Sequence, residues 1–406
     1  MFTFPEKGLP NEKVMEHLEK IKNLKAYPET SFSAYSTDPH PVAIDSISRL
    51  LPYNRNNIGT HTRIEDPKRF VAKLEKETVI MLGELMGDKD TDGYITQGGT
   101  EGNIMGLWIG RNMLRRHPDT KKICLIKTAL THYSIEKAVD ILALDAFDIP
   151  LNEEYGMDAG NFEKKVRSLA ENGYTGFVVV LTLGYNITGT VDPIDEIDAS
   201  VKNLEKELPV VFYTHIDAAI GGMVHPFISK KQLGFNFNSV NSISIDMHKN
   251  GFVPRTAGVF LCRKGLQKNI ERDTPYINYG IDDTLSGSRP ASSAAASWSV
   301  IHALGKEGFT EIIKKELELK HYFINLLDAH KNELPTHLIT HPESNILAVH
   351  FKSLSEFRIP KPLEKKYSLK PSIIADERGG GRYYYTIIFM PHVTKRALAE
   401  FVADLT

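Results

Sequence analysis

The sequence predicts an α/β protein in which a mainly parallel sheet is covered by helices on both faces. Short apolar segments alternate with amphipathic segments from about residue 67 to residue 263. Each amphipathic segment is long enough to form a helix that crosses back over the sheet, and this alternation is typical of parallel strands. The chain has 406 residues and is 41% hydrophobic, so it can bury a large core.

The N-terminal residues 1–55 are predicted to form an arm. Residues 11–23 are amphipathic, and a stretch containing proline and serine follows through Pro41. An arm with too few apolar residues for its own core usually packs on something else, often a partner subunit.

Residues 56–300 are predicted to form the large domain, beginning with a helix over 67–86. The predicted strands cover 92–96, 122–127, 147–150, 176–182, 209–214, 242–245 and 258–263. The helices predicted between them cover 104–114, 134–144, 159–171 and 193–208.

Residues 301–406 are predicted to form a smaller α+β domain. Helices over 292–304 and 310–329 lead into it, strands are expected at 336–340, 346–351 and 383–390, and a capped helix is expected over 394–405. The glycine run at 379–381 is typical of a hairpin connection.

Composition excludes several classes of function. The net charge of −2 gives no basis for binding nucleic acid or an anionic membrane surface. Cys124 and Cys262 lie in apolar runs, which favours buried thiols over a disulfide or a metal site. The N-terminus lacks a signal pattern and no stretch approaches about 18 apolar residues, so we expect a cytoplasmic protein without membrane contact.

The strongest chemical signal is Lys249, which follows the apolar strand that ends near Ile245. A lysine buried at such a position loses the hydration that stabilises its ammonium form, which lowers its pKa and makes the amine a nucleophile toward carbonyls. The alternative is a surface lysine in a turn. Three upstream segments favour the first interpretation.

These segments each follow a predicted strand. The glycine-rich run 98–103 opens a helix and can bind an anion through backbone N–H groups. His132 can stack on a flat ring, and Asp217 can pair with a protonated ring nitrogen, with Ala219 leaving room for that ring. Taken singly, the run could be an ordinary turn, and the histidine and aspartate could be helix caps. Together with Lys249 they match the phosphate, ring, ring nitrogen and aldehyde of pyridoxal 5′-phosphate.

On these motifs the chain resembles the group II pyridoxal-phosphate-dependent amino-acid decarboxylases, and most closely the bacterial histidine decarboxylases. The matching motifs are Gly-Gly-Thr-Glu-Gly-Asn at 98–103, His-Tyr-Ser at 132–134, Asp-Ala-Ala at 217–219, His-Lys at 248–249 and Ser-Gly-Ser-Arg at 286–289. The resemblance implies fold type I, the aspartate-aminotransferase-like fold, with a mostly parallel seven-stranded sheet. It also implies a homodimer whose subunits share each active site.

The resemblance assigns roles to individual residues. Lys249 would bind the cofactor aldehyde covalently, Asp217 would pair with the ring nitrogen, and His132 and Ala219 would lie on opposite faces of the ring. The phosphate would be held by Gly99, Thr100 and His248, with Ser288 reaching over from a second subunit. The proton donor to the substrate would be Tyr279, with Tyr276 as the alternative. Arg382 and Asn57 would contact the substrate.

One segment departs from the family pattern. Tyr185 and Asn186 stand where the family usually has threonines, so the site is altered close to the cofactor.

The expected reaction is decarboxylation of an L-amino acid, with histidine the leading substrate, followed by aromatic or acidic amino acids. A carbon–carbon lyase of the sphingosine-phosphate lyase type is the rival; it would need a basic cluster for a phosphorylated substrate, and only Arg255, Lys264 and Arg382 are candidates. A non-catalytic scaffold has no use for both Lys249 and Asp217. A dehydrogenase is disfavoured because no G-x-G-x-x-G motif follows a first strand.

Overall fold

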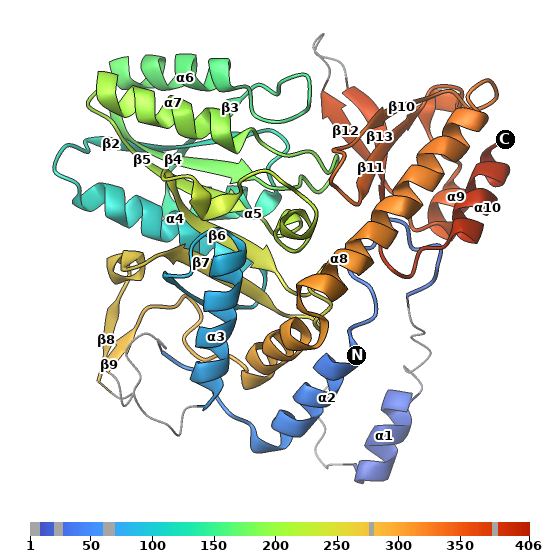
Figure 1. The fold of residues 1–406 in the computed structure, drawn as a ribbon, viewed down its shortest axis with the longest axis horizontal. Coiled ribbons are helices and arrows are strands. Elements are labelled where there is room, and N and C mark those ends of the chain that lie inside the picture. Colours follow the sequence, from blue (N-terminus) through green and yellow to red (C-terminus); the bar gives the residue numbers. More distant parts are fainter. Residues whose placement is uncertain (1–8, 20–26, 60–69, 276–279, 376–380) are drawn as a thin grey trace.

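The computed structural model describes residues 9–19, 27–59, 70–275, 280–375 and 381–406, and it confirms the predicted fold class (Figure 1). The large sheet has seven strands in the order β1-β7-β6-β5-β4-β2-β3. All run parallel except β7, which is antiparallel to both neighbours. Their bounds are β1 Thr91–Thr96, β2 Lys122–Thr128, β3 Asp145–Ile149, β4 Tyr174–Thr182, β5 Val211–Asp217, β6 Val240–Asp246 and β7 Gly258–Arg263.

Strand β4 shows why the sheet is covered on both faces. Successive side chains of a strand point to opposite faces. Phe177 and Val179 belong to one buried cluster together with side chains of α6 (Ala159–Glu171) and α7 (Ile194–Glu207). Val178 and Val180 belong to another cluster, with side chains of α4 (Gly99–Arg116) and α5 (Tyr133–Leu142). A strand that is apolar at consecutive positions therefore lies between two helical layers.

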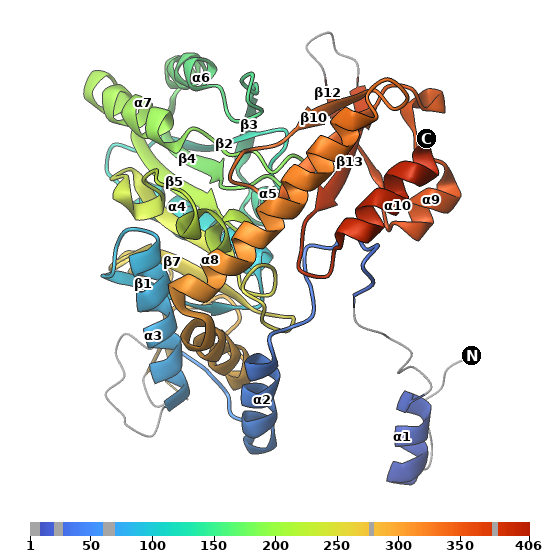
Figure 2. The ribbon, with the colours of Figure 1, turned by 45° about the vertical axis from the view of Figure 1, so that its right-hand side comes forward.

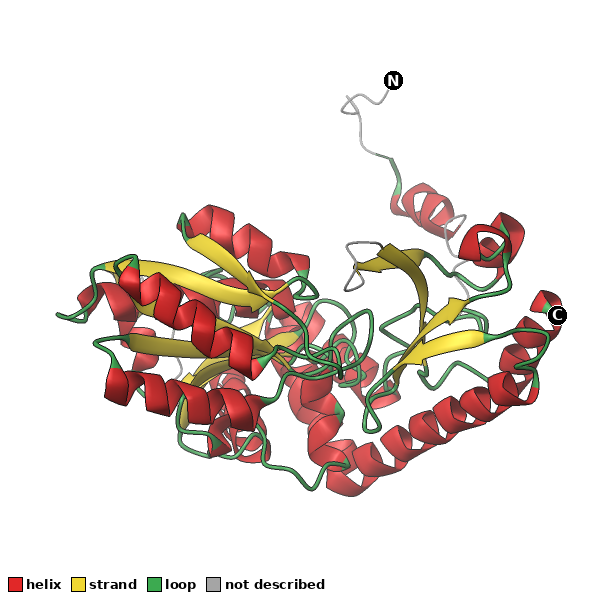
Figure 3. Ribbon diagram, turned by 90° about the horizontal axis from the view of Figure 1, so that it is seen from above, coloured by secondary structure: helices red, strands yellow, loops and turns green. Residues whose placement is uncertain are grey.

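The helix α8 (Ala291–Ala329) joins the two parts of the molecule (Figure 3). Ala294 and Val300 pack in the large core, whereas Phe323 and Leu327 pack in the C-terminal core. The sequence predicts two helices here; the structure has one element with a break at Gly305, whose φ of 57° suits glycine. The helix passes through residue 300, and the domain limits stay a prediction.

The C-terminal part is built on a four-stranded antiparallel sheet in the order β10-β11-β13-β12. Strand β12 and helix α9 were not predicted from the sequence. The bounds are β10 Thr336–Ile339, β11 Ile346–Phe351, β12 Pro371–Ala375, β13 Gly381–Ile388, α9 Lys361–Lys366 and α10 Lys395–Leu405.

The N-terminal segment contains two described helices. Figures 1 and 2 both show α1 (Asn11–Glu19) standing apart from the rest of the chain, as expected for an arm. The second helix, α2 (Pro41–Leu50), was not predicted, although Pro41 stands in its first turn and the His40 ring caps it. Helix α2 lies against α8 and buries Ala43. None of the described helices has the length and apolar content needed to cross a bilayer.

A buried ion pair joins α3 (Phe70–Leu85) to the segment before α8. Arg289 and Glu75 bond directly, and each side chain is 1% exposed. Arg289→Met removes this cation from the buried Glu75 carboxylate, so we expect the free energy of unfolding to fall by about 3–5 kcal/mol. Urea denaturation would measure this. Lys264→Ala is the control, because the Lys264–Asp90 pair is about two-thirds exposed and should contribute below about 1 kcal/mol. Equal losses in the two variants would contradict the prediction.

Candidate active site

A pocket of about 640 Å³ lies where several parallel strands end. Strands β2, β4, β5 and β6 end at the same edge of the sheet, and α4 begins there after β1. The pocket brings together most of the residues predicted to hold the cofactor: Gly99, Thr100, His132, Asp217, Ala219, His248 and Lys249.

Lys249 lies just beyond the end of β6, with its side chain 18% exposed. Its Nζ is 3.0 Å from Oδ2 of Asp246, which ends β6 and is itself 6% exposed. The amine is therefore paired with a carboxylate that was not predicted from the sequence. Asp246 stands three residues before the lysine, and that spacing was the signal that could have identified it.

Asp217 is held by a buried chain of hydrogen bonds that sequence reasoning missed. Its Oδ2 accepts from Asn103 Nδ2 at 2.8 Å, and its Oδ1 accepts from the Ala219 N–H at 3.1 Å. His215 Nε2 donates to Asn103 Oδ1 at 3.0 Å, and His215 Nδ1 lies 2.8 Å from Ser242 Oγ. Burial lowers the pKa of His215 to about 3, so its ring is neutral. Through its hydrogen bond to Asn103, this ring helps to hold the Asp217 carboxylate in place.

His132 both caps a helix and lines the pocket, the two positions that its motif allowed. It caps α5, where its Nδ1 accepts from the Ser134 N–H and lies 2.8 Å from Ser134 Oγ. The ring also lines the pocket. Burial lowers the pKa of His132, although the nearby Asp217 opposes this shift. A neutral, oriented imidazole in this place can stack on a flat ring.

The start of α4 leaves room for an anion because it has no side chains at two positions. Gly98 caps the helix at φ 137°, a value that favours glycine. A Cβ on Gly98 would lie 3.1 Å from His248 Cε1, and one on Gly99 would lie 3.0 Å from the Cβ of Ala219. The Gly99 N–H donates to Asp246 Oδ1. Nδ1 of His248 donates to the Ala257 carbonyl at 2.9 Å, and burial lowers its pKa.

The two residues that depart from the family pattern both line the pocket. The Tyr185 hydroxyl, however, bonds to the Asp192 carboxylate at 2.8 Å and lies 2.7 Å from Thr128 Oγ1. Burial raises the pKa of Asp192 to about 6 and that of Tyr185 well above its ordinary value. Tyr185 therefore stabilises the pocket wall. The Asn186 carbonyl accepts from Tyr35, a residue of the N-terminal segment that sequence reasoning did not place at the site.

The turn that follows Lys249 is anchored to helix α8 and to the C-terminal part of the molecule. Asn250 Nδ2 donates to Glu316 of α8 at 2.9 Å, and Asn345 of the C-terminal part donates to the same carboxyl group at 2.9 Å. Burial raises the pKa of Glu316 well above its ordinary range. This cluster ties the lysine-bearing turn to both parts of the molecule.

Other predicted site residues lie elsewhere or outside the described part. Ser288 is exposed, accepts from Asn56 Nδ2 at 2.9 Å and does not line the pocket. Asn57 is buried and donates to Glu75 at 2.9 Å. Arg382 is exposed on β13 and does not line the pocket. Tyr276 and Tyr279 lie outside the described residues. The assigned roles of all these residues stay predictions.

Comparison with known proteins identifies the chemistry of this pocket. The sequence model described as "Pyridoxal-dependent decarboxylase conserved domain" matches residues 10–354. A probable L-aspartate decarboxylase from Pyrococcus abyssi is 32% identical, over 100% of this chain and 99% of the relative. A tryptophan decarboxylase from Clostridium sporogenes is 30% identical, over 97% and 94%. The structure of L-methionine decarboxylase from Streptomyces sp. 590 shares the fold, with a TM-score of 0.84, 20% identity and coverage of 100% and 96%.

These findings correct one part of the sequence analysis. The relatives carry the names of aspartate and tryptophan decarboxylases, so the predicted likeness to histidine decarboxylases is wrong, and histidine is not supported as the leading substrate. The motifs that carried the resemblance surround the cofactor, which family members share. They do not report on the substrate side chain.

The pocket fits pyridoxal 5′-phosphate. Thr100 and His248, at the start of α4 and beyond β6, suit the phosphate, whereas the Gly99 N–H is engaged by Asp246. The Asp217 carboxylate suits a protonated ring nitrogen, and the Lys249 amine suits the aldehyde. A Cβ at Gly98 would crowd His248, and a Cβ at Gly99 would crowd Ala219 and Asp246, so both positions need glycine for the site to keep its shape.

Proposed function

Because the chain belongs to the pyridoxal-dependent decarboxylase family and is an amino-acid decarboxylase that uses pyridoxal 5′-phosphate, we propose that its substrate is an acidic L-amino acid, with L-aspartate first. The observation that carries this proposal is Arg255. Among the described residues that line the pocket, Lys249 and Arg255 are the lysines and arginines. With Lys249 engaged by the cofactor, Arg255 supplies the cation for a side-chain carboxylate.

Arg255 is positioned by the N-terminal segment. Its Nη2 donates to Ser36 Oγ at 2.9 Å, and the Ser36 hydroxyl donates to the His248 carbonyl at 2.8 Å. The guanidinium is exposed, so its remaining donors can reach a ligand in the pocket. A planar guanidinium recognises a carboxylate through two parallel hydrogen bonds.

The protein residues have distinct tasks in the reaction. The bound cofactor supplies a ring that accepts the electron pair released when the bond to the substrate carboxylate breaks. Asp217, which accepts a hydrogen bond from Asn103, would keep a proton on the ring nitrogen, and His132, which lines the pocket, would cover one face of the ring. Lys249 would hold the aldehyde group of the bound cofactor through its side-chain amine. The proposed donor of the proton to Cα remains Tyr279, with Tyr276 as the alternative.

The rival functions find less support. A carbon–carbon lyase acting on a phosphorylated substrate needs a basic cluster, but Lys264 is paired with Asp90 on the surface and Arg382 lies off the pocket. The family model and the relatives carry the names of decarboxylases, which disfavours a scaffold. We further propose a homodimer in which Ser288 reaches the partner's phosphate site, and a cytoplasmic location.

The experiment is detection of carbon dioxide and amine from a panel of L-amino acids with added cofactor. We expect aspartate to give the highest kcat/KM, ahead of glutamate, tyrosine, tryptophan and histidine. In Arg255→Met, KM for aspartate should rise about 10- to 100-fold, which corresponds to loss of a charge-assisted hydrogen bond pair. Activity on any aromatic substrate should change little in this variant.

Ser36→Ala is the matched control, since it removes the partner of Arg255 and leaves the guanidinium in place. It should change KM far less than Arg255→Met. A preference for tyrosine or tryptophan in the wild type, or an unchanged KM for aspartate in Arg255→Met, would overturn the substrate proposal.

A further inference from the structure

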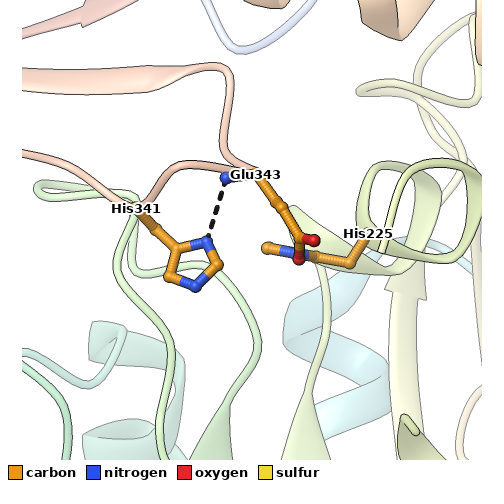
Figure 4. A group of neighbouring side chains, drawn as sticks. All are labelled: His225, His341 and Glu343. Carbon is orange, nitrogen blue, oxygen red and sulfur yellow. Dashed lines mark hydrogen bonds and ion pairs between the residues drawn. The ribbon is translucent and has the colours of Figure 1, made fainter. Parts of the chain in front are cut away.

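We propose that His225, His341 and Glu343 form a binding site for a divalent transition metal of the zinc class. His225 opens the 3-10 helix η3 (His225–Phe227), which follows β5 in the large domain. His341 and Glu343 lie in the turn between β10 and β11 of the C-terminal part. Figure 4 shows the three side chains converging from these two segments.

The geometry brings one ligand atom of each residue within 4.8 Å of the others. His225 Nδ1 lies 3.8 Å from Glu343 Oε2, and the two imidazole rings have their centroids 5.4 Å apart. Zinc bonds to nitrogen and oxygen of about 2.0–2.2 Å require tetrahedral ligands to lie about 3.5 Å apart. Small side-chain rotations close the remaining gap.

The donor set selects the class of ion. Two imidazoles and one carboxylate are ligands for zinc, cobalt and nickel, whereas magnesium and calcium prefer oxygen. The His225 side chain is 3% exposed and that of Glu343 is 30% exposed, so the cluster has a buried side and a side open to solvent. A water molecule can complete the coordination from the open side.

The turn that carries two of the ligands is held in shape. Lys320 of α8 is 1% exposed, and its Nζ donates to the carbonyls of His341 at 2.8 Å and Pro342 at 3.1 Å, and to that of Ser344. This ammonium fixes the backbone around the ligands before any ion arrives.

Two features limit the affinity of this cluster for a metal ion. Lys320 and Lys231 are cations close enough to act on His341, and they oppose the charge of an ion. In addition, the Glu343 N–H donates to His341 Nδ1 at 3.2 Å. An ion on Nδ1 replaces this hydrogen bond directly, and an ion on Nε2 moves the ring proton to Nδ1, so either mode of binding costs the hydrogen bond. We therefore expect binding that is saturable at micromolar metal, not the tight binding of a closed structural zinc site.

A bound ion would join the two parts of the molecule next to the active site. His225 lies a few residues after Ile220, which lines the cofactor pocket, and the other ligands come from the C-terminal sheet. The sequence alone predicts no metal site, because His225 and His341 are far apart in the chain and come together only in the fold.

The test is titration of the tag-free holoenzyme with Co²⁺ alone, followed by its d–d absorption bands and by calorimetry. We expect one ion per chain in the wild type, unaffected by excess Mg²⁺ and displaced by Zn²⁺. His341→Ala and Glu343→Gln should each weaken binding at least about tenfold. His321→Ala is the matched control, since His321 is exposed on α8 and outside the cluster, and it should bind as the wild type does.

The readout is independent of turnover, so it separates this site from the cofactor pocket. Cys124 and Cys262 are buried and do not compete for the ion. Thermal melting with and without Zn²⁺ should show stabilisation in the wild type and in His321→Ala, and not in His341→Ala. Absence of stoichiometric Co²⁺ binding in the wild type, or binding of unchanged affinity in both ligand variants, would overturn the proposal.

Discussion

Replacing Lys249 with alanine is expected to reduce decarboxylation by at least about a thousandfold, because the variant has no amine with which to hold the cofactor aldehyde. The visible absorbance of the bound cofactor should disappear from the purified protein together with turnover. Steady-state carbon dioxide release and the absorption spectrum measure the two effects on the same sample.

The loss must be separated from damage to the fold, since alanine also leaves Asp246 without its cation. Lys249→Arg keeps a positive charge near Asp246 but cannot perform the amine chemistry. We expect it to melt close to the wild type and to be as inactive as Lys249→Ala. Retained turnover in either variant would refute the central role of this residue.

Replacing Asp217 with asparagine should lower kcat about a hundredfold or more while the cofactor stays attached. Asparagine is similar in shape and can still accept from the Ala219 N–H, but it has no charge with which to keep a ring nitrogen protonated. The cofactor absorbance should persist because Lys249 is intact. This combination of retained absorbance and lost turnover distinguishes the variant from Lys249→Ala.

The exposed Asp90 provides a comparison, because Asp90→Asn changes the same functional group far from the pocket. It should leave kcat unchanged. If Asp217→Asn turned over as fast as Asp90→Asn, the carboxylate would have no electrostatic part in the reaction.

The meeting of Gly99, His132, Asp217 and Lys249 in one pocket could be predicted from sequence because they lie in short motifs, while their roles stay predictions. Asp217 ends a strand and the other three follow one, and strands that run parallel end at the same edge of the sheet. Local pattern and topology therefore suffice to bring these residues together. The substrate could not be predicted in this way, and the relatives give no support to histidine as the leading candidate.

Residues that act through distant partners were missed. Asn103 meets His215 across 112 positions, and Arg289 meets Glu75 across 214. Nothing in the local sequence distinguishes these polar residues from surface ones. Their partners become visible only when separate elements pack together.

The sequence by itself determined the alternation of strands and helices and the order of the motifs, because both are properties of neighbouring residues. Only the tertiary structure decided that Tyr35 and Arg255 border the pocket and that His225 meets His341. These arrangements depend on which side chains face one another after the layers pack, and burial in a shared low-dielectric space then sets their hydrogen bonds and charges.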